Sequence, residues 1–492
     1  MSWLWGNLNW VVFAPLIGAA VILRCPRTAV QRMQRIALVT TGLTLLLSLG
    51  LLTQFEAGEA TLQLEQLRPW IPAVNIWYHL GIDGISLPLV LLTALLAFLA
   101  CVGSLGITER VKEYFVLYLL LETGMLGTFV ALDLFLFYIF WEVVLVPMYF
   151  LIGIWGGGRR EYSAMKFFLY TLAGSLAMLL GILAVYLHTG SFDLIALRER
   201  AGADFPLGLQ QVLFLAFFLA FAVKVPVFPF HTWLPDAHVD APTPISVLLA
   251  GVLLKMGGYG FFRISYPLFP DGARWFVPAT AILALINILY GALVAMAQTD
   301  FKRLVAYSSV SHMGFVLLGL ASLTETGLQG GLLQMVSHGL ITGGMFFLVG
   351  VLYDRTHTRD LTAFGGLGAH LPLYAGLLTF FALASLGLPG LSGFVSEFLS
   401  LLGAFPTQQL ITALAIVGIV LTAGYMLLML QRVLLGPRNP RWHALPDMTR
   451  RELVTLVPLL LLIAFIGLYP WSVLRLQAAS LAFLLRLVGG AS

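Results

Sequence analysis

The sequence predicts an all-α polytopic membrane protein with about fourteen transmembrane helices. Of the 492 residues, 60% are hydrophobic and only 10% are charged, and the mean hydropathy is +0.94. A soluble domain carries about a quarter charged residues, so this chain has too little charge to cover a water-facing surface. Apolar runs of about 17–25 residues recur along the whole chain, whereas the alternating segments of an outer-membrane barrel are missing.

The expected spans divide the chain without leaving room for a separate soluble domain, so residues 1–492 are expected to form one membrane domain. The first apolar run follows an N-terminus without a basic region, and we expect it to be retained as a span. The last apolar stretch, 471–488, contains two arginines and is expected to lie at the membrane interface. The spans are expected at 8–24, 36–54, 83–106, 113–131, 133–155, 163–188, 209–234, 243–265, 275–297, 302–323, 328–353, 370–403, 408–434 and 452–470.

The positive charges are distributed unevenly between the odd-numbered and the even-numbered connections that join successive spans. Of the 27 Lys and Arg residues, 18 fall in or beside odd-numbered connections and 5 in or beside even-numbered ones. The excess of cations marks the cytoplasmic side. Both termini are therefore expected on the outer side.

Two pairs of segments resemble each other. "FAVKVPVFPFHTWL" (221–234) aligns with "FALASLGLPGLSGF" (381–394), and 169–183 resembles 337–352. The offset is five spans, and an odd offset gives the two copies opposite topology. We therefore expect two inverted five-helix repeats, at 113–265 (spans 4–8) and 275–434 (spans 9–13). Prolines and glycines predict two broken helices, near 224–229 and 387–390.

Five ionisable side chains fall deep in apolar runs: Glu122, Glu142, Lys224, Lys255 and Glu397. The two lysines are the only Lys or Arg residues that we place deep inside spans. Each such group costs about 2.5–3.5 kcal/mol on insertion scales, which indicates a polar interior with partners and favours an ion or proton path. A purely structural ion pair is the alternative. We expect Glu142 to pair with Lys224, with Lys255 further along the same row of polar groups. Glu122 fits a role in tuning the path or a structural role equally well.

Histidines supply titrating groups between these charges. His231 and His238 flank "TWLPDA", and His312 and His338 lie on adjacent spans beside several serines. A single histidine in a span is more often a satisfied core residue, but two on adjacent spans favour a polar file. Lysine, unlike arginine, can lose its proton when it is buried, so two inner lysines favour proton handling over anion binding.

Several site classes have no support in the sequence. The two cysteines lie far apart, no tight His/Cys cluster suggests a metal site, and no glycine-rich nucleotide motif occurs. We expect no cofactor and no metal in this chain, and no nucleic-acid partner.

Four blocks of the sequence stand out: "FWEVVLVPMYFLIGIWGG" (140–157), "KVPVFPFHTWLPDAHVDAPTPISVLLAGVLLKMGGYG" (224–260), "DFKRLVAYSSVSHMGF" (300–315) and "GLPGLSGFVSEF" (387–398). In these blocks the chain resembles the antiporter-like subunits of respiratory complex I, the proton-pumping NADH-quinone oxidoreductase, and in particular the subunit M (chain 4) family. The resemblance covers nearly the whole chain.

The resemblance implies a function and a path. In related subunits and in multisubunit cation/proton antiporters the position of Glu397 is usually lysine, so this glutamate favours subunit M; an antiporter subunit is the alternative. Glu142 would modulate Lys224, and Lys255 would pass the proton onward through or near His312 and His338. Glu397 would deliver it to the outer side.

The resemblance also implies partners and a location. NADH, FMN, iron–sulfur clusters and quinone would sit in partner subunits, with antiporter-like neighbours on either side in the lipid bilayer. The expected location is a bacterial inner membrane with periplasmic termini, or a thylakoid membrane in a photosynthetic relative. The type of quinone, and NADH or ferredoxin as electron donor, stay open.

Overall fold

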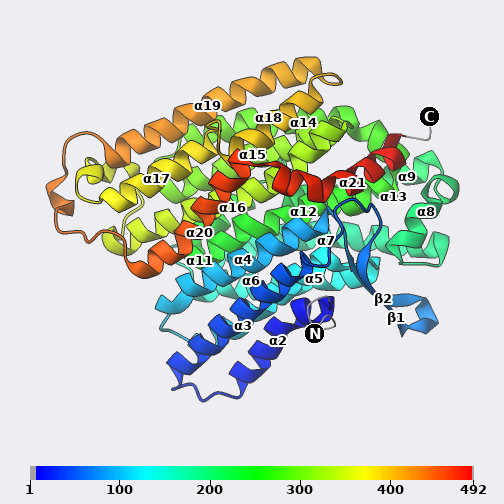
Figure 1. Ribbon diagram of the computed structural model, residues 1–492, viewed down its shortest axis with the longest axis horizontal. Helices are drawn as coiled ribbons and strands as arrows, with labels where there is room; N and C mark the ends of the chain where they lie inside the picture. The colour runs from blue at the N-terminus through cyan, green and yellow to red at the C-terminus, as the bar shows by residue number, and fades with distance from the viewer. Residues whose placement is uncertain (1–6, 490–492) are drawn as a thin grey trace.

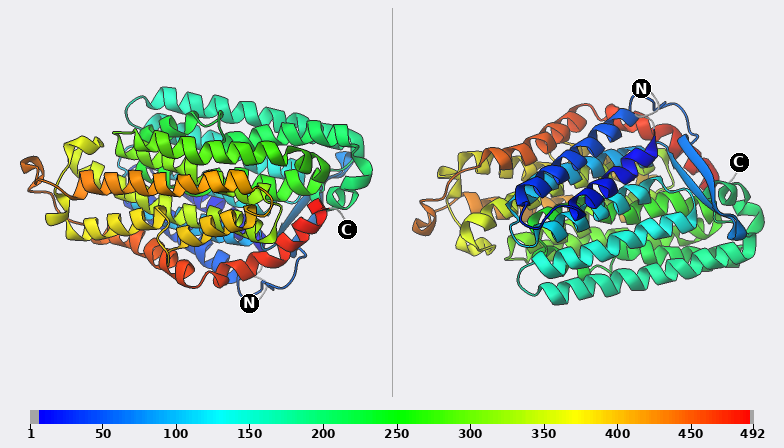
Figure 2. Two further views of the ribbon diagram at one scale, coloured as in Figure 1. Left: turned by 90° about the horizontal axis from the view of Figure 1, so that it is seen from above. Right: turned by 90° about the horizontal axis from the view of Figure 1, so that it is seen from below.

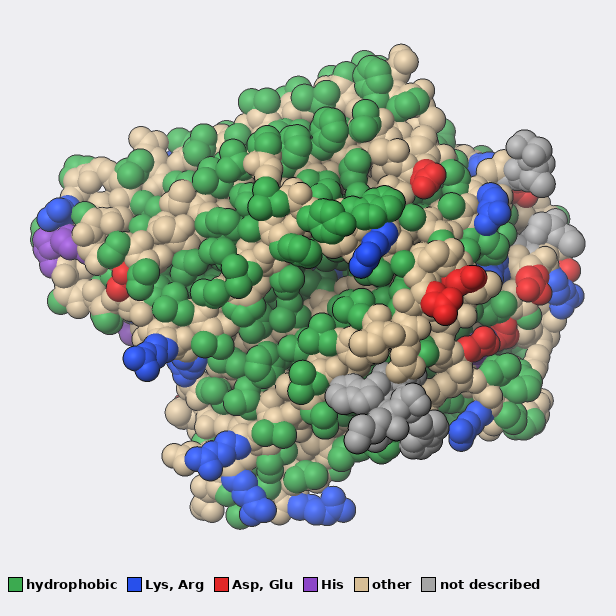
Figure 3. Space-filling view, in the orientation of Figure 1, with side chains coloured by type: hydrophobic (Ala, Val, Ile, Leu, Met, Phe, Trp, Pro, Cys, Tyr) green, Lys and Arg blue, Asp and Glu red, His purple; other side chains and the backbone are tan. Residues whose placement is uncertain are grey.

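The computed structural model describes residues 7–489, without the side chains of 201–203. Long helices lie side by side in one bundle, with α19 at the top of Figure 1 and α2 and α3 at the bottom. Hydrophobic side chains cover most of the visible face, and most charged side chains lie towards its two ends (Figure 3). The prediction of an all-α polytopic membrane protein is confirmed.

The elements follow one another from α2 to α21, with a single hairpin near the start. The helices are α2 (Leu8–Leu23), α3 (Val30–Leu51), α4 (Ser86–Gly103), α5 (Val111–Val130), α6 (Leu134–Trp155), α7 (Arg160–Thr189), α8 (Leu194–Asp204), α9 (Leu207–Lys224), α10 (Trp233–Asp240), α11 (Thr243–Leu248), α12 (Leu254–Gly260), α13 (Tyr266–Leu268), α14 (Pro270–Met296), α15 (Phe301–Ala321), α16 (Glu325–Thr356), α17 (Pro372–Ser385), α18 (Ser392–Ala404), α19 (Gln409–Leu434), α20 (Arg450–Leu468) and α21 (Trp471–Gly489). The hairpin strands are β1 (Gln63–Ile71) and β2 (Ile76–Ile82), paired antiparallel.

Each of the fourteen predicted segments coincides with one helix or with consecutive helices. Within residues 7–489, 13 helices are long and apolar enough to cross a membrane; this set includes α21 and omits the shorter α2, α17 and α18. In both views of Figure 2, α21 runs at an angle to the bundle helices.

The helix that ends at Lys224 is separated from α10 by a stretch containing Pro226 and Pro229. A proline has no N–H to donate, so such a stretch needs other partners for its backbone. The side chain of Asn287 on α14 accepts from Phe228 N at 2.8 Å and donates to Pro226 O at 3.2 Å. Internal side chains thus replace the water that a loop would normally use. A similar stretch, 386–391, separates α17 from α18.

The helical segment Thr243–Leu268 lies at the centre of the bundle and is buried from residue 244 onwards. It consists of α11, α12 and α13, joined by two π-helical stretches, η3 (Leu249–Leu253) and η4 (Phe261–Ser265). A π stretch holds one extra residue in the turn and is frequent at functional sites. The most apolar stretch of α16 is also buried throughout, whereas at most 33% of that of α3, α19 or α20 is buried.

At the end of the bundle that carries the β1–β2 hairpin, His79 lies between two carboxylates. Its Nε2 is 2.8 Å from Glu65 Oε1, and its Nδ1 contacts Asp193, which caps α8. Burial alone would lower the pKa of His79, but the carboxylates of Asp193 and Glu65 outweigh burial and raise this pKa. The hairpin is therefore tied to α8 by the contact of His79 with Asp193.

Because the pKa of His79 is raised on folding, its contribution to stability is complete below its unfolded pKa of about 6.5. It is lost as the pH rises through the higher folded pKa. We expect the protection of β1 and β2 amides against hydrogen exchange, after correction for the intrinsic pH dependence of exchange, to fall by about 1 kcal/mol as the pH rises above about 6.5. The variant His79→Gln should remove this pH dependence. Equal pH dependence in the two proteins would contradict the prediction.

Candidate functional site

Lys255 and His338 form a direct contact at the centre of the bundle. Both side chains are at least 97% buried. The Lys255 ammonium donates to His338 Nδ1 at 2.6 Å and to the carbonyl of Ala250, which lies in the π stretch η3. Lys255 comes from α12 and His338 from α16, so this contact joins two central helical segments.

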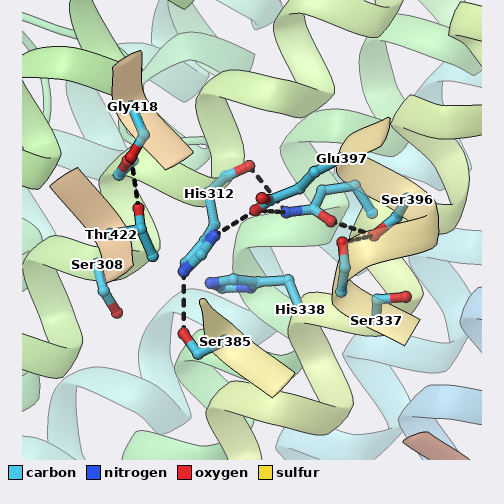
Figure 4. A network of polar contacts seen from close by, with 12 residues as sticks. Ser308, His312, Ser337, His338, Ser385, Ser396, Glu397, Gly418 and Thr422 are labelled. Atoms are coloured by element: carbon cyan, nitrogen blue, oxygen red, sulfur yellow. Dashed lines mark hydrogen bonds and ion pairs between the residues drawn. The ribbon is translucent and has the colours of Figure 1, made fainter. Parts of the chain in front are cut away.

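A second contact joins His312 of α15 to Glu397 of α18. His312 Nδ1 is 2.7 Å from Glu397 Oε1, and His312 Nε2 is 3.1 Å from Ser385 Oγ. Gln334 of α16 also donates to Glu397 Oε1, at 3.1 Å. Figure 4 shows His312 between Glu397 and Ser385, with His338 beside it. The predicted association of His312, His338 and Glu397 is thus present in the geometry.

The two contacts are adjacent but are not directly bonded to each other. The rings of His312 and His338 are 5.7 Å apart between centroids. A cavity of about 10 Å³ is lined by His312, His338, Glu397 and neighbouring residues. This volume is close to the minimum that one water molecule needs. Lys255, His338, His312 and Glu397 therefore form one file, here called the central file, with a single short gap.

Lys224 and Glu142 lie outside the central file and do not form a direct ion pair with each other. Lys224 is 1% exposed, and neither its ammonium nor Glu142 Oε1 has a hydrogen-bond partner among the described residues. The Lys224 ammonium lies 5.2 Å from the centre of the Trp141 ring and 5.6 Å from that of Phe167, so aromatic faces supply part of its environment. Glu142 is near enough to interact with Lys224 electrostatically. The sequence predicted the pairing of these two groups but not a contact between them, because it does not give side-chain reach across α6 and α9.

A glycine brings Lys224 close to the helix of Lys255. A Cβ added to Gly257 would lie 2.7 Å from Phe221 O and 2.9 Å from the Lys224 Cβ. No side chain can therefore separate α9 from α12 at this point, two residues beyond Lys255.

The remaining predicted residues are buried but less connected. His231 packs against Phe228 and Tyr290, and His238 stacks on Phe346 with 4.5 Å between ring centroids. Both ring nitrogens of each histidine, and both carboxylate oxygens of Glu122, lack a partner within the described structure. His238 is close enough to Lys255 for electrostatic interaction, whereas no contact joins Glu122 to the central file among the described residues.

Two buried cations and several polar partners were not predicted from the sequence. Arg263, near the end of the predicted span 243–265, lies inside the segment Thr243–Leu268 and is 7% exposed; Lys302 is 4% exposed and donates to Ala241 O. Gln334 precedes His338 by one helical turn, a spacing that could have placed both on one face. The position of Ser385 beside His312 depends on how α15 and α17 pack, which no sequence pattern gives.

Nothing in residues 7–489 gathers three or more His, Cys, Asp or Glu side chains in a metal-holding arrangement. Cys25 and Cys101 are separate, buried thiols. The chemistry that the central file can perform is proton exchange between lysine, imidazole and carboxylate.

The fold and the central file define an antiporter-like membrane subunit with a buried file of titratable groups. The chain matches the family model described as NADH:quinone oxidoreductase/Mrp antiporter, TM, over residues 131–422. It is 45% identical to NADH-quinone oxidoreductase subunit M of Rhodobacter capsulatus, over 97% of this chain and 96% of that protein. The chain belongs to the NADH-quinone oxidoreductase subunit M family.

Solved structures agree with this assignment. A chain of respiratory complex I from Thermus thermophilus with bound NADH superposes with a TM-score of 0.89 at 34% identity, covering 98% of this chain and 100% of that one. A chain of the Mrp complex from Dietzia sp. DQ12-45-1b superposes with a TM-score of 0.87 at 22% identity, covering 98% of both, and shows the shared fold alone.

Helices α16 and α18 lie close together, which helps to place Glu397 beside His312. Gly330 allows this close approach of the two helices. A Cβ on Gly330 would lie 2.3 Å from Ser400 N and 2.7 Å from Leu399 C. We expect Gly330→Ala to cost about 1–3 kcal/mol by overpacking and to lower the melting temperature of the detergent-solubilised protein. The control is Gly376→Ala on α17, where a Cβ meets nothing within 4 Å. Equal melting temperatures would contradict the prediction.

Proposed function

We propose that this chain is a proton-translocating membrane subunit of an NADH-quinone oxidoreductase. The observation that carries the proposal is the central file, in which a buried lysine, two histidines and a carboxylate follow one another across four helices. Ionisable groups inside a membrane are expensive and usually line ion or proton paths. A file of four is more than a structural ion pair requires.

The proposed route begins at Glu142 and Lys224 and continues through the central file. Lys255 gives a proton from its Nζ to His338 Nδ1, and the imidazolium releases a proton from Nε2 towards His312. His312 passes a proton to Glu397, to which its Nδ1 is already hydrogen-bonded. His231, His238 and Glu122 support the route as nearby titratable groups.

We place the redox chemistry in partner subunits. NADH, FMN, iron–sulfur clusters and quinone would be bound there, and this chain would contain no redox site. The support is the chemistry of the central file, which exchanges protons only. The neighbours would be antiporter-like subunits packed against the exposed apolar faces of the bundle.

We propose that the end carrying the β1–β2 hairpin faces outward, with both termini on that side. The excess of Lys and Arg at the opposite end supports this orientation, and Figure 3 shows such a group at its lower left. The membrane would be a bacterial inner membrane, or a thylakoid membrane in a photosynthetic relative. α21 would lie at the outer interface, consistent with its angle to the bundle (Figure 2).

We also propose the two inverted repeats, 113–265 and 275–434. Two isolated bridges support them: Asp133 pairs with Asp193, and Asp300 pairs with Asp360, at the same spacing in sequence. All four aspartates accept backbone N–H groups at the start of a helix. The interruptions after Lys224 and after Ser385 would be the broken helices of the two copies.

A cation/proton antiporter subunit is the second candidate, favoured by the shared fold with the Mrp complex. Glu397 favours the first candidate, because the resemblance implies lysine at this position in cation/proton antiporters. Purification of the native complex separates the two. Flavin and iron–sulfur proteins should accompany this chain, and their absence would favour the antiporter.

The decisive variant is Lys224→Met in the assembled enzyme. Because methionine carries no proton, we expect proton pumping to fall about tenfold or more, with a parallel loss of coupled quinone reduction. Both rates are measured together in vesicles. The control is Lys112→Met, since Lys112 lies near a helix start and donates only to Cys25 O. If Lys224→Met leaves both rates unchanged in assembled enzyme, the proposed function is wrong.

A further inference from the structure

Lys255, Tyr259 and Arg263 succeed one another along the segment Thr243–Leu268. Residues four apart lie on one face of a helix, so this face points from the central file towards the hairpin end. Lys255 and Tyr259 have no exposed surface, whereas Arg263 is 7% exposed. Arg263 is thus the polar residue at which this face approaches the surface.

Arg263 is held from both sides. Its Nε donates to the Tyr259 hydroxyl at 3.1 Å, and its Nη2 donates to Asp83 Oδ1. Asp83 directly follows β2 and also accepts from the backbone N–H groups of Ile85 at 2.9 Å and Ser86 at 3.1 Å. The adjacent Gly84 N donates to Ser480 of α21. The ion pair is therefore fixed to α4 and lies against α21.

The direction of these hydrogen bonds matters for proton movement. A relay passes a proton only through groups that both accept and donate. The Tyr259 hydroxyl donates to the carbonyl of Phe129 at 2.9 Å, which cannot pass a proton on. A guanidinium has five donors and no acceptor and stays charged in proteins. A proton approaching from the hairpin end therefore meets no acceptor at Arg263.

We propose that Arg263, held by Asp83, is a barrier that separates Lys255 from the outer side of the membrane. This inference rests on the proposed function. Lys255 and Arg263 are about two helical turns apart, or about 11 Å along the axis. Without a barrier, protons driven by the gradient would reach Lys255 from outside and return to the cytoplasm without passing Glu397. The barrier confines the proton of Lys255 to the sideways transfer to His338.

The test compares Arg263→Lys with wild type in the assembled enzyme in vesicles. Lysine keeps the positive charge and can pair with Asp83, so a purely structural role should be preserved. Lysine can also lose and regain a proton, so a barrier role should fail. We expect passive proton flux under an imposed pH gradient to rise severalfold and the number of protons pumped per electron to fall, while uncoupled quinone reduction continues.

The matched control is Arg355→Lys. Arg355 pairs with Glu452 at 2.7 Å near the other end of the bundle, and its replacement should leave proton flux unchanged. A second variant, Asp83→Asn, keeps the oxygen that accepts from Ile85, Ser86 and Arg263 but removes the negative charge that holds Arg263; it should also leak. Adding Lys255→Met to Arg263→Lys should abolish the leak, because the inner proton acceptor is gone.

Vesicles with Arg263→Lys that are as proton-tight as wild type, with unchanged pumping per electron, would overturn the inference. So would a leak that persists in the double variant, since the protons would then follow another route. Failure of the proposed function is a separate result, visible as normal pumping in Lys224→Met.

Discussion

The contact between Lys255 and His338 is the interaction on which the centre of the bundle depends. An ammonium in hydrocarbon must find its partners inside the protein, and Lys255 finds two, the imidazole of His338 and the carbonyl of Ala250. Both helices must therefore pack without lipid between them. Glycines make this approach feasible: a Cβ on Gly339 would lie 2.9 Å from Gly251 O. The glycines of these helices thus allow the close packing that the contacts of Lys255 require.

The same constraint explains why a helix can end inside the bundle. Lys224 is the last residue of α9, where the carbonyl end of the helix favours a cation. The carbonyl of Val223 accepts from the indole of Trp233 at 2.9 Å, and Asn287 satisfies the stretch that follows. The interruption is thus stabilised by specific side chains, and it leaves the side chain of Lys224 in the interior of the bundle.

The spans and the buried ionisable residues could be predicted from the sequence, because a bilayer requires long apolar runs and a charged residue within such a run is rare. A run of apolar residues containing Lys224, Lys255 or Glu397 stands out by composition alone. The sequence does not show how each helix is rotated about its axis or how far its side chains reach. The burial of Arg263, near the end of the predicted span 243–265, was not recognised because the helical segment continues to Leu268. The pairing of His312 with Ser385 depends on helix packing. The absence of a direct Glu142–Lys224 contact has the same cause.

The two halves of the proposed route differ in a way that suits a pump. The central file is almost continuous, whereas Glu142 and Lys224 are opposite charges that lie near each other without touching. A route that was continuous throughout would conduct in both directions and dissipate the gradient. In a low-dielectric interior the attraction between two ions rises steeply as they approach. A small movement of α6 against α9 would therefore change the proton affinity of Lys224 more than the same movement could change any neutral hydrogen bond. We therefore place the control of the proposed proton route at the separation between Glu142 and Lys224.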